Sequence, residues 1–183
     1  MKELSLNILD IVMNSVKAGA KIIAIRITED NRTLAITIED NGCGMTAEQL
    51  ERLSDPFFTT RTTRQVGLGV PFFRLAAEQT GGGINITSVP ISEDEVKHGT
   101  VVTALFYKDH IDYTPLGDII ATVITLIQGN ADINFDFSHT INGYAINLST
   151  AEMRSELGED IPLNSFEVLE WIKEYLNEQY NGI

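Results

Sequence analysis

Residues 10–20 read D-I-V-M-N-S-V-K-A-G-A, and the spacing of their side chains predicts a helix with two distinct faces. Apolar side chains recur every three or four positions at Leu9, Met13, Val16 and Ala20. Polar side chains recur in the same way at Asn7, Asp10, Asn14 and Lys17. We therefore expect this helix to lie on a sheet, with the apolar stripe buried and the polar stripe directed at a cleft.

Asp10 and Asn14 lie one helical turn apart, so a carboxylate and an amide oxygen point the same way. Magnesium takes a few protein oxygens of this kind and keeps several of its waters. A solvated helix face would carry the same residues, and the helix taken alone favours that plainer interpretation.

A strand hairpin follows the helix. Residues 21–28 and 33–39 are rich in β-branched side chains, and E-D-N-R at residues 29–32 supplies the turn. The second strand leads into D-N-G-C-G-M at residues 40–45. The Asp40 carboxylate can accept a hydrogen bond from an amino group such as that of adenine, and Gly42 and Gly44 let a flat ring approach the backbone. The alternative is a plain Asp-Asn-Gly turn.

A glycine-rich segment, G-L-G-V at residues 67–70, opens an apolar helical stretch over residues 70–79. Pro71 suits the first turn of a helix, where its missing N–H group costs little. Free N–H groups and the positive end of the helix dipole favour phosphate at such a place. Lys17 and Arg61 can add charge. A polar loop with a glycine cap is the alternative, because a lone G-x-G is a weak signal.

Together with D-P-F-F-T-T-R at residues 55–61, these segments resemble the nucleotide-binding domain shared by histidine kinases, DNA gyrase, heat-shock chaperones and mismatch-repair ATPases. The resemblance covers roughly residues 3–107. The helix segment N-S-V-K-A-G-A is similar to mismatch-repair ATPases, whereas D-P-F-F-T-T-R, G-L-G-V, T-G-G-G-I-N-I and G-T-V-V resemble sensor histidine kinases. The implied fold is a two-layer α/β sandwich of the Bergerat ATP-binding type over residues 1–108. A small α+β region of unknown role is expected over residues 109–183.

The same resemblance implies ATP and Mg²⁺ as cofactors and assigns residues to them. Asn14 would coordinate magnesium, and Asp40 would contact the adenine amino group. The adenine pocket would also include Gly42, Gly44, Met45 and Thr100. The phosphates would be met by Lys17, Thr59, Thr60, Arg61, Gly67, Leu68, Gly69 and Val70.

Two departures from the family pattern bear on chemistry. Asp10 is the candidate catalytic residue, but it stands where hydrolytic members usually have Glu. Its side chain is shorter by ~1.5 Å, and a misplacement of that size can cost a hundredfold in rate. Gln65 stands where many kinases have another Gly, so the resemblance does not imply the backbone phosphate contact of that Gly. ATP binding is therefore better supported than hydrolysis.

The composition of the chain argues against several classes of function and of site. The formal net charge of −13 argues against a nucleic-acid or anionic-membrane surface, which would need basic patches. The single cysteine, Cys43, allows no intrachain disulfide and no cysteine cluster for zinc. We find no signal-peptide pattern and no apolar run approaching ~20 residues, so we expect a cytoplasmic protein without a membrane span.

The pattern of apolar and polar side chains changes after residue 108. We expect a helix over residues 116–128, a hairpin of residues 132–137 and 144–148 around T-I-N-G, and helices over residues 150–157 and 165–180. H-I-D-Y-T-P at residues 110–115 partly resembles a kinase phosphoacceptor motif, but Thr114 as N-cap and Pro115 at the first helical position explain it more simply. A helical stripe that we expect in the core, or at a partner surface if exposed, comprises Val168, Trp171, Ile172 and Tyr175.

Three functions remain open from the sequence. The first is an ATP-binding regulatory switch, or slow ATPase. The second is a serine or histidine protein kinase acting in trans, and the third is a non-catalytic nucleotide-binding interaction module. The expected partners are ATP and an unidentified protein, with no nucleic acid or membrane. The chain also resembles small stand-alone ATP-binding proteins.

Overall fold

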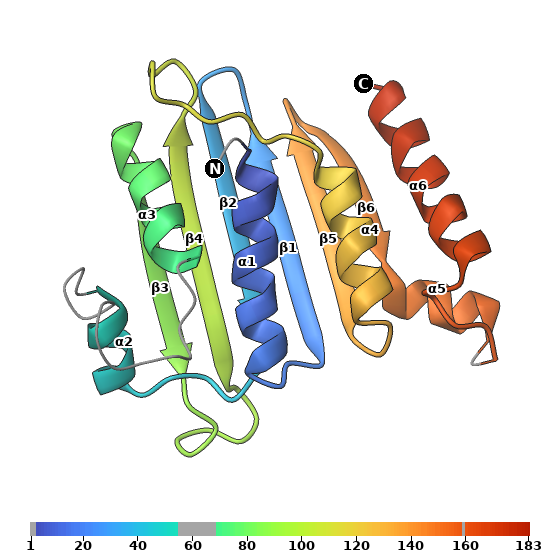
Figure 1. Ribbon diagram of the computed structural model, residues 1–183, viewed down its shortest axis with the longest axis horizontal. Helices are drawn as coiled ribbons and strands as arrows, with labels where there is room; N and C mark the ends of the chain where they lie inside the picture. Colours follow the sequence, from blue (N-terminus) through green and yellow to red (C-terminus); the bar gives the residue numbers. More distant parts are fainter. Residues whose placement is uncertain (1–2, 55–68, 159) are drawn as a thin grey trace.

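A six-stranded mixed sheet forms the centre of the protein in a computed structural model, which describes residues 3–54, 69–158 and 160–183 (Figure 1). The elements in chain order are α1 (Leu4–Lys17), β1 (Ile22–Glu29), β2 (Thr33–Asp40), α2 (Ala47–Ser54), α3 (Gly69–Gln79), β3 (Gly83–Val89), β4 (Gly99–Tyr107), α4 (Ile119–Gly129), β5 (Asn134–Ile141), β6 (Tyr144–Ser149), α5 (Thr150–Leu157) and α6 (Phe166–Asn181). The strands and helices expected from the sequence are present, with ends that differ by a few residues.

The strand order across the sheet is β3-β4-β2-β1-β5-β6. β5 joins β1 in parallel, with Ile22 opposite Asn134 and Glu29 opposite Ile141, whereas the other neighbouring strands are antiparallel. Hydrogen bonding therefore runs continuously from the strands before residue 108 to those after it. The division into units of residues 1–108 and 109–183 stays a prediction.

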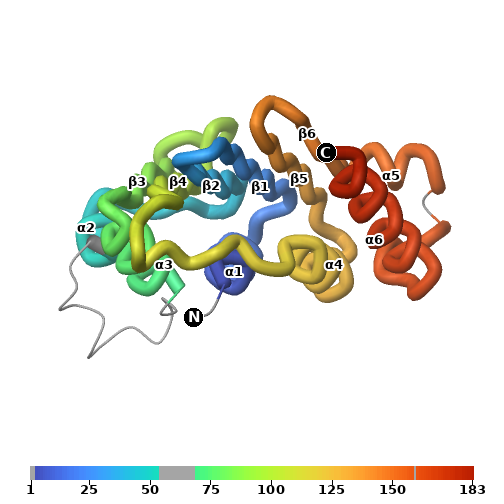
Figure 2. The backbone as a smooth tube through the Cα atoms, turned by 90° about the horizontal axis from the view of Figure 1, so that it is seen from above, coloured from blue at the N-terminus to red at the C-terminus, as the bar shows by residue number. Residues whose placement is uncertain are grey.

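The protein has two layers. Figure 2 shows α1, α3 and α4 on the same side of the sheet. Alternate residues of the strands are buried beneath these helices, because successive side chains of a strand point to opposite faces. The buried strand residues include Ile23, Ile25, Ile27, Leu34, Ile36, Ile38, Phe135 and Phe137. The predicted two-layer α/β sandwich is thus confirmed.

The buried face of α1 differs from the predicted one. Leu4, Ile8, Ile11 and Val12 are fully buried, and the predicted apolar stripe only packs partly against the core. Asn7, predicted on the polar face, is 2% exposed. The reason is that α1 lies between α3 and α4 and contacts both, so its flanks are covered as well as its underside. Ala20 is buried, but it lies beyond the end of the helix.

The segment before α4 supplies hydrogen-bond acceptors to the start of α1. It also shows that the predicted N-cap of α4 is wrong. α4 begins at Ile119 with Asp118 as N-cap, whose carboxylate accepts from the Ala121 N–H group at 2.8 Å. Thr114 and Pro115 therefore do not cap this helix. The carbonyl oxygens of Pro115 and Leu116 instead accept from Leu4 and Ser5 at 2.9 and 2.8 Å. Those N–H groups open α1 and have no partner within that helix.

The hairpin of β5 and β6 turns where the sequence predicts it. Asn142 and Gly143 have φ of 48° and 91°, which matches the type I′ turn that Asn-Gly favours. α6 bonds to the outer edge of β6 at Asn147: the Gln179 amide accepts from the Asn147 N–H at 3.0 Å and donates to the Asn147 carbonyl at 3.1 Å. One side chain thus occupies edge positions that a further strand would use.

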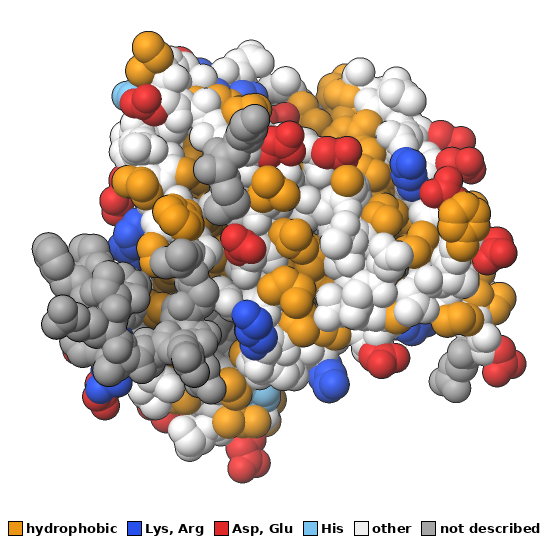
Figure 3. Space-filling model, in the orientation of Figure 1, with side chains coloured by type: hydrophobic (Ala, Val, Ile, Leu, Met, Phe, Trp, Pro, Cys, Tyr) orange, Lys and Arg blue, Asp and Glu red, His pale blue; other side chains and the backbone are white. Residues whose placement is uncertain are grey.

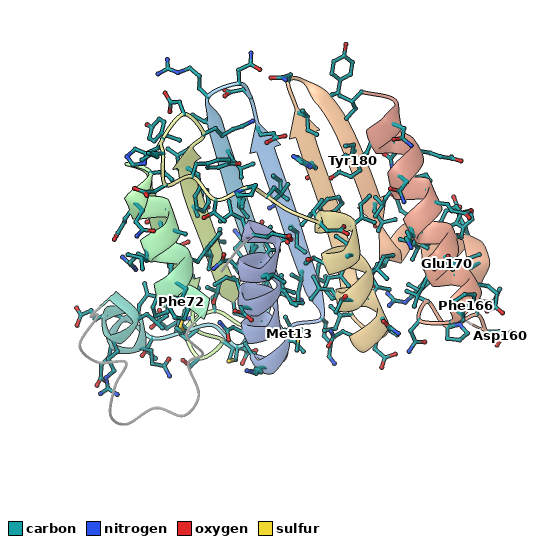
Figure 4. The ribbon with its side chains drawn as sticks, turned by 45° about the horizontal axis from the view of Figure 1, so that its top comes forward. Met13, Phe72, Asp160, Phe166, Glu170 and Tyr180 are labelled. Atoms are coloured by element: carbon teal, nitrogen blue, oxygen red, sulfur yellow. The ribbon has the colours of Figure 1, made fainter. Side chains whose placement is uncertain are left out.

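A buried polar cluster ties α6 to the sheet. His139 is 2% exposed, and its Nδ1 lies 2.7 Å from the hydroxyl of Tyr180, which Figure 4 labels on α6. Its Nε2 lies 3.7 Å from Glu29 and has no hydrogen-bond partner in the described part of the chain. Glu29 also pairs with Lys108 at 3.3 Å. Burial lowers the pKa of His139, and burial also raises the pKa of Tyr180.

Candidate functional site

The predicted site residues gather where the end of α1, the start of α3 and the turn after β2 meet. The Cys43 N–H donates to the Ala18 carbonyl at 2.9 Å, which ties the turn to the residue that follows α1. These elements lie on the helix-covered face of the sheet, toward the end at which β2 finishes and β4 begins (Figure 1).

α1 presents three of the predicted residues along one side. Asp10 and Lys17 are exposed and Asn14 is half-buried. Neither Asp10 nor Lys17 forms an ion pair with another described residue. The Asn14 amide and Asp10 carboxylate therefore offer oxygen atoms at the surface, which suits a hydrated magnesium ion. No group of three or more His, Cys, Asp or Glu side chains within the described ranges could hold a metal by itself.

The start of α3 lies directly against this side of α1. Gly69 is the first residue of α3, and a Cβ atom there would lie 2.8 Å from the Cβ of Asp10. No acidic residue occupies the first turn of α3, so its free N–H groups and positive dipole end are not offset by its own sequence. A helix start that packs against Asp10, one turn before Asn14, fits a phosphate that shares a metal ion with these side chains. Val70 is buried, so its side chain belongs to the core.

Asp40 is held in place by two donors at the end of β2. The Ser15 hydroxyl donates to Oδ2 at 2.5 Å, and the Gly42 N–H donates to Oδ1 at 2.8 Å. A carboxylate has about four acceptor positions, so these two bonds leave capacity for a ligand amino group. Ser15 is buried on α1 and was not predicted as a site residue. The signal that the sequence offered was its position next to Asn14.

The glycines of the turn serve the packing of the turn itself. Gly44 has φ of +67°, a conformation that side chains rarely adopt. A Cβ atom there would lie 2.0 Å from the Val89 carbonyl oxygen. Gly42 is also buried, and its carbonyl accepts from His98 Nδ1 at 2.6 Å. Close approach within the protein therefore explains these glycines without reference to a ligand.

Ser88, which was not predicted as a site residue, links Met45 to Thr100 through hydrogen bonds. The Ser88 hydroxyl accepts from the Met45 N–H at 2.8 Å and lies 2.8 Å from the Thr100 hydroxyl. Thr100 stands opposite Asp40 in the pairing of β2 and β4. Ser88 occupies an inward position at the end of β3, which the alternation of that strand could have indicated.

The structure thus brings together Asp10 with Gly69, Asp40 with Ser15, and Met45 with Thr100. The predicted phosphate residues Thr59, Thr60, Arg61, Gly67 and Leu68 lie outside the described residues, as does Gln65. None of the helices in the described ranges is long and apolar enough to cross a membrane.

Sequence comparison agrees with the order of these elements. The sequence profile of the histidine kinase-, DNA gyrase B- and HSP90-like ATPases matches residues 2–110, which is more than half of the chain. Among curated proteins, sensor histidine kinase ZraS of Klebsiella oxytoca is 36% identical over 87 residues, covering 45% of this chain and 18% of the kinase. The histidine-protein kinase AtoS of Escherichia coli is 33% identical over 90 residues, covering 49% and 15%. The chain therefore spans less than a quarter of the length of these relatives.

Solved structures share the fold at low identity. The N-terminal domain of a DNA repair protein superposes with a TM-score of 0.55 at 20% identity, covering 81% of this chain and 53% of that one. The Aquifex aeolicus MutL ATPase domain, solved with ADP, gives a TM-score of 0.53 at 13% identity and covers 86% and 68%. Both matches extend beyond residue 110, so the fold likeness includes part of the C-terminal region.

Proposed function

Because the chain belongs to the family of histidine kinase-, DNA gyrase B- and HSP90-like ATPases, we propose that it binds magnesium-ATP between α1, the start of α3 and the turn after β2. The observation that carries this proposal is the packing of Gly69 against Asp10. That contact sets the phosphate-attracting start of α3 beside the oxygen atoms of α1. The ADP bound in the MutL structure, which has the same fold, supports a nucleotide here.

The proposed site residues form two groups, one at the adenine end of the nucleotide and one at the phosphate end. Asp40 accepts from the adenine amino group, with Met45 and Thr100 beside the base. Asn14 supplies an oxygen to magnesium, which offsets the charge of the phosphates, and Lys17 adds a cation near them. The assignments of Thr59, Thr60, Arg61, Gly67 and Leu68 to the phosphates stay predictions.

We assign the protein to the regulatory switches, as a cytoplasmic protein with slow turnover at most. Asp10 is the acidic residue on the α1 face nearest the start of α3, and it is the candidate to orient a water at the terminal phosphate. Its side chain is short for that task, so the attacking water would be poorly placed. A bound nucleotide that turns over slowly suits a protein whose output is a change of state.

A protein partner is part of this proposal. Leu6 on α1 and Phe72 and Leu75 on α3 are exposed apolar side chains on the two helices that border the proposed site. Figure 3 shows hydrophobic side chains over these helices, and Figure 4 labels Phe72. An exposed apolar surface of this kind is typical of a docking face for another protein.

Protein kinase activity in trans is the second candidate, and the likeness to ZraS and AtoS favours it. Incubation of the pure protein with γ-labelled ATP, alone and with cell extract, separates the candidates. Release of free phosphate at a slow rate supports the switch, and label on a second protein supports the kinase. Bound but unaltered ATP supports a non-catalytic module. Failure to bind ATP with Mg²⁺ in calorimetry overturns the proposal itself.

A further inference from the structure

A concave surface lies on the face of the sheet opposite to α1, α3 and α4. It is a hollow of about 560 Å³ between β1, β5 and β6 on one side and α5 and α6 on the other. Asp136 alternates with the buried Phe135 and Phe137, so its side chain points away from α1, α3 and α4. The volume of the hollow falls in the range of about 300–1,000 Å³ that is usual for ligand sites.

Two aromatic rings form one wall of this hollow. Trp171 and Tyr175 lie one turn apart on α6 and stack at 5.2 Å between centroids, with 11° between their planes. They remain 51% and 37% exposed, whereas their neighbours Ile172 and Leu176 are fully buried. The predicted stripe on α6 is thus split: Val168 and Ile172 belong to the core, and the two aromatic residues face solvent. An exposed stacked pair offers a flat platform that attracts cations through its π electrons.

Apart from Arg26, the charged side chains that line the hollow are acidic. Asp136, Glu152 and Glu156 line it, and none of them forms an ion pair with another described residue. The basic side chain in the lining, Arg26, is paired with Glu39 at 2.6 Å. The nearby Arg154 on α5 donates to Asn134 and to backbone carbonyl oxygens, so it does not offset these carboxylates.

We infer that this hollow is a docking site for a basic segment of a partner protein, whose arginine or lysine side chains enter between the carboxylates and stack on Trp171 and Tyr175. The charge of the lining is complementary to such a segment, and the chain as a whole carries −13. Continuous strand addition along β6 is blocked at Asn147, whose N–H and carbonyl groups already bond to Gln179. Recognition therefore goes through side chains. The inference does not depend on nucleotide binding.

Trp171 is the only tryptophan of the chain, so its fluorescence reports directly on this site. The full chain is titrated with an eight-residue peptide of alternating glycine and arginine, and with matched glycine–serine and glycine–glutamate peptides. We expect saturable fluorescence change with the arginine peptide alone, weakened several-fold by raising salt from about 50 to 300 mM, since exposed charges are screened. Equal response to the three peptides, or no response at millimolar peptide, overturns the inference.

Variants assign the binding to the hollow. Glu152→Gln combined with Glu156→Gln should weaken peptide affinity by roughly fivefold to twentyfold, since each exposed ion pair contributes modestly. Glu170→Gln is a control for charge removal outside the lining: it removes one charge from α6 next to Trp171 but does not line the hollow, and it should change affinity by less than about twofold. Glu170 is labelled in Figure 4.

A third variant tests the aromatic platform, and a sugar ligand tests the rival chemistry. Trp171→Ala, followed by calorimetry, should weaken peptide binding by about threefold or more. Aromatic faces also stack on sugars, so a neutral hexasaccharide is titrated in parallel. Binding of the sugar but not the peptide overturns the inference in favour of a carbohydrate site. Peptide binding that survives both the double Gln variant and Trp171→Ala places the peptide elsewhere and also overturns it.

Discussion

The Ser15 hydroxyl donates a 2.5 Å hydrogen bond to Oδ2 of Asp40, joining the buried side of α1 to the end of β2. These residues are 25 positions apart in the chain, and the bond holds the carboxylate in one orientation before any ligand arrives. A hydrogen bond to a charged group contributes about 1.5–3 kcal/mol. The residue that orients Asp40 is therefore expected to matter nearly as much for binding as Asp40 itself.

Asp40→Asn should weaken ATP binding at least about tenfold, because it removes a charge-assisted acceptor for the adenine amino group. Ser15→Ala should weaken it by roughly threefold to tenfold, because the carboxylate loses its fixed orientation. The double variant should be less impaired than the sum of the two, since both changes act on one contact. Calorimetry measures the cycle. Strict additivity, or equal affinity of the parent protein for ATP and GTP, contradicts the placement of adenine at Asp40.

Gly69→Ala should weaken nucleotide binding about tenfold, because its Cβ atom would lie 2.8 Å from that of Asp10 and must push α3 away from α1. Gly129→Ala is the matched control, since a Cβ atom at the end of α4 meets nothing within 4 Å. Affinity is followed by calorimetry and folding by thermal unfolding. A Gly69→Ala protein that binds ATP like the parent would show that the start of α3 does not hold the phosphates.

Asn14→Ala should abolish the part of ATP affinity that depends on Mg²⁺, because it removes the proposed protein oxygen on the metal. Each protein is titrated with ATP in excess Mg²⁺ and again in EDTA. The parent should bind more tightly with Mg²⁺, and the variant should bind equally in both buffers. A full metal effect in the variant contradicts the role of Asn14.

Asp10 should control turnover rather than binding. Asp10→Asn should strongly reduce any phosphate release in a steady-state assay while leaving ATP affinity within a few-fold of the parent, since the amide cannot take a proton from water. Asp10→Glu should speed release, because the longer side chain restores the reach found in hydrolytic relatives. Parental turnover by Asp10→Asn would remove the general-base role and strengthen the kinase or binding-module alternatives.

His139 should make the protein less stable in mild acid. Burial lowers its pKa below the ordinary 6.5, so below pH 6.5 the unfolded chain takes up a proton that the folded chain resists. The free energy of unfolding should therefore fall as pH drops from about 6.5, by at most about 1.4 kcal/mol per pH unit for one proton. The groups that face this ring are Glu29, Lys108 and Tyr180.

Urea unfolding at several pH values between roughly 7.5 and 5 tests this dependence. His139→Gln should flatten the fall in stability, whatever its effect at neutral pH. His110→Gln, at an exposed histidine, is the control for the loss of an imidazole ring from the surface. Identical slopes for the parent and His139→Gln would show that another group titrates in this range.

Local patterns in the sequence determined most of the secondary structure and the family. β-branched residues predicted β1 and β2, and Asn142-Gly143 predicted the turn between β5 and β6. The order of the segments around Asn14, Asp40 and Gly69 indicated the ATP-binding fold. These signals are readable because each depends on residues within a few positions of one another.

Tertiary structure decided which elements meet. The parallel pairing of β5 with β1, the contact of Ser15 with Asp40 and the carbonyl groups of Pro115 and Leu116 at the start of α1 all join distant segments. Side-chain periodicity predicts that a face of a helix or strand will be buried. Which elements cover that face depends on the packing of the whole chain. For this reason Asn7 is buried although the helical pattern placed it on the polar face, and Trp171 is exposed, which the pattern had left as the alternative to a core position.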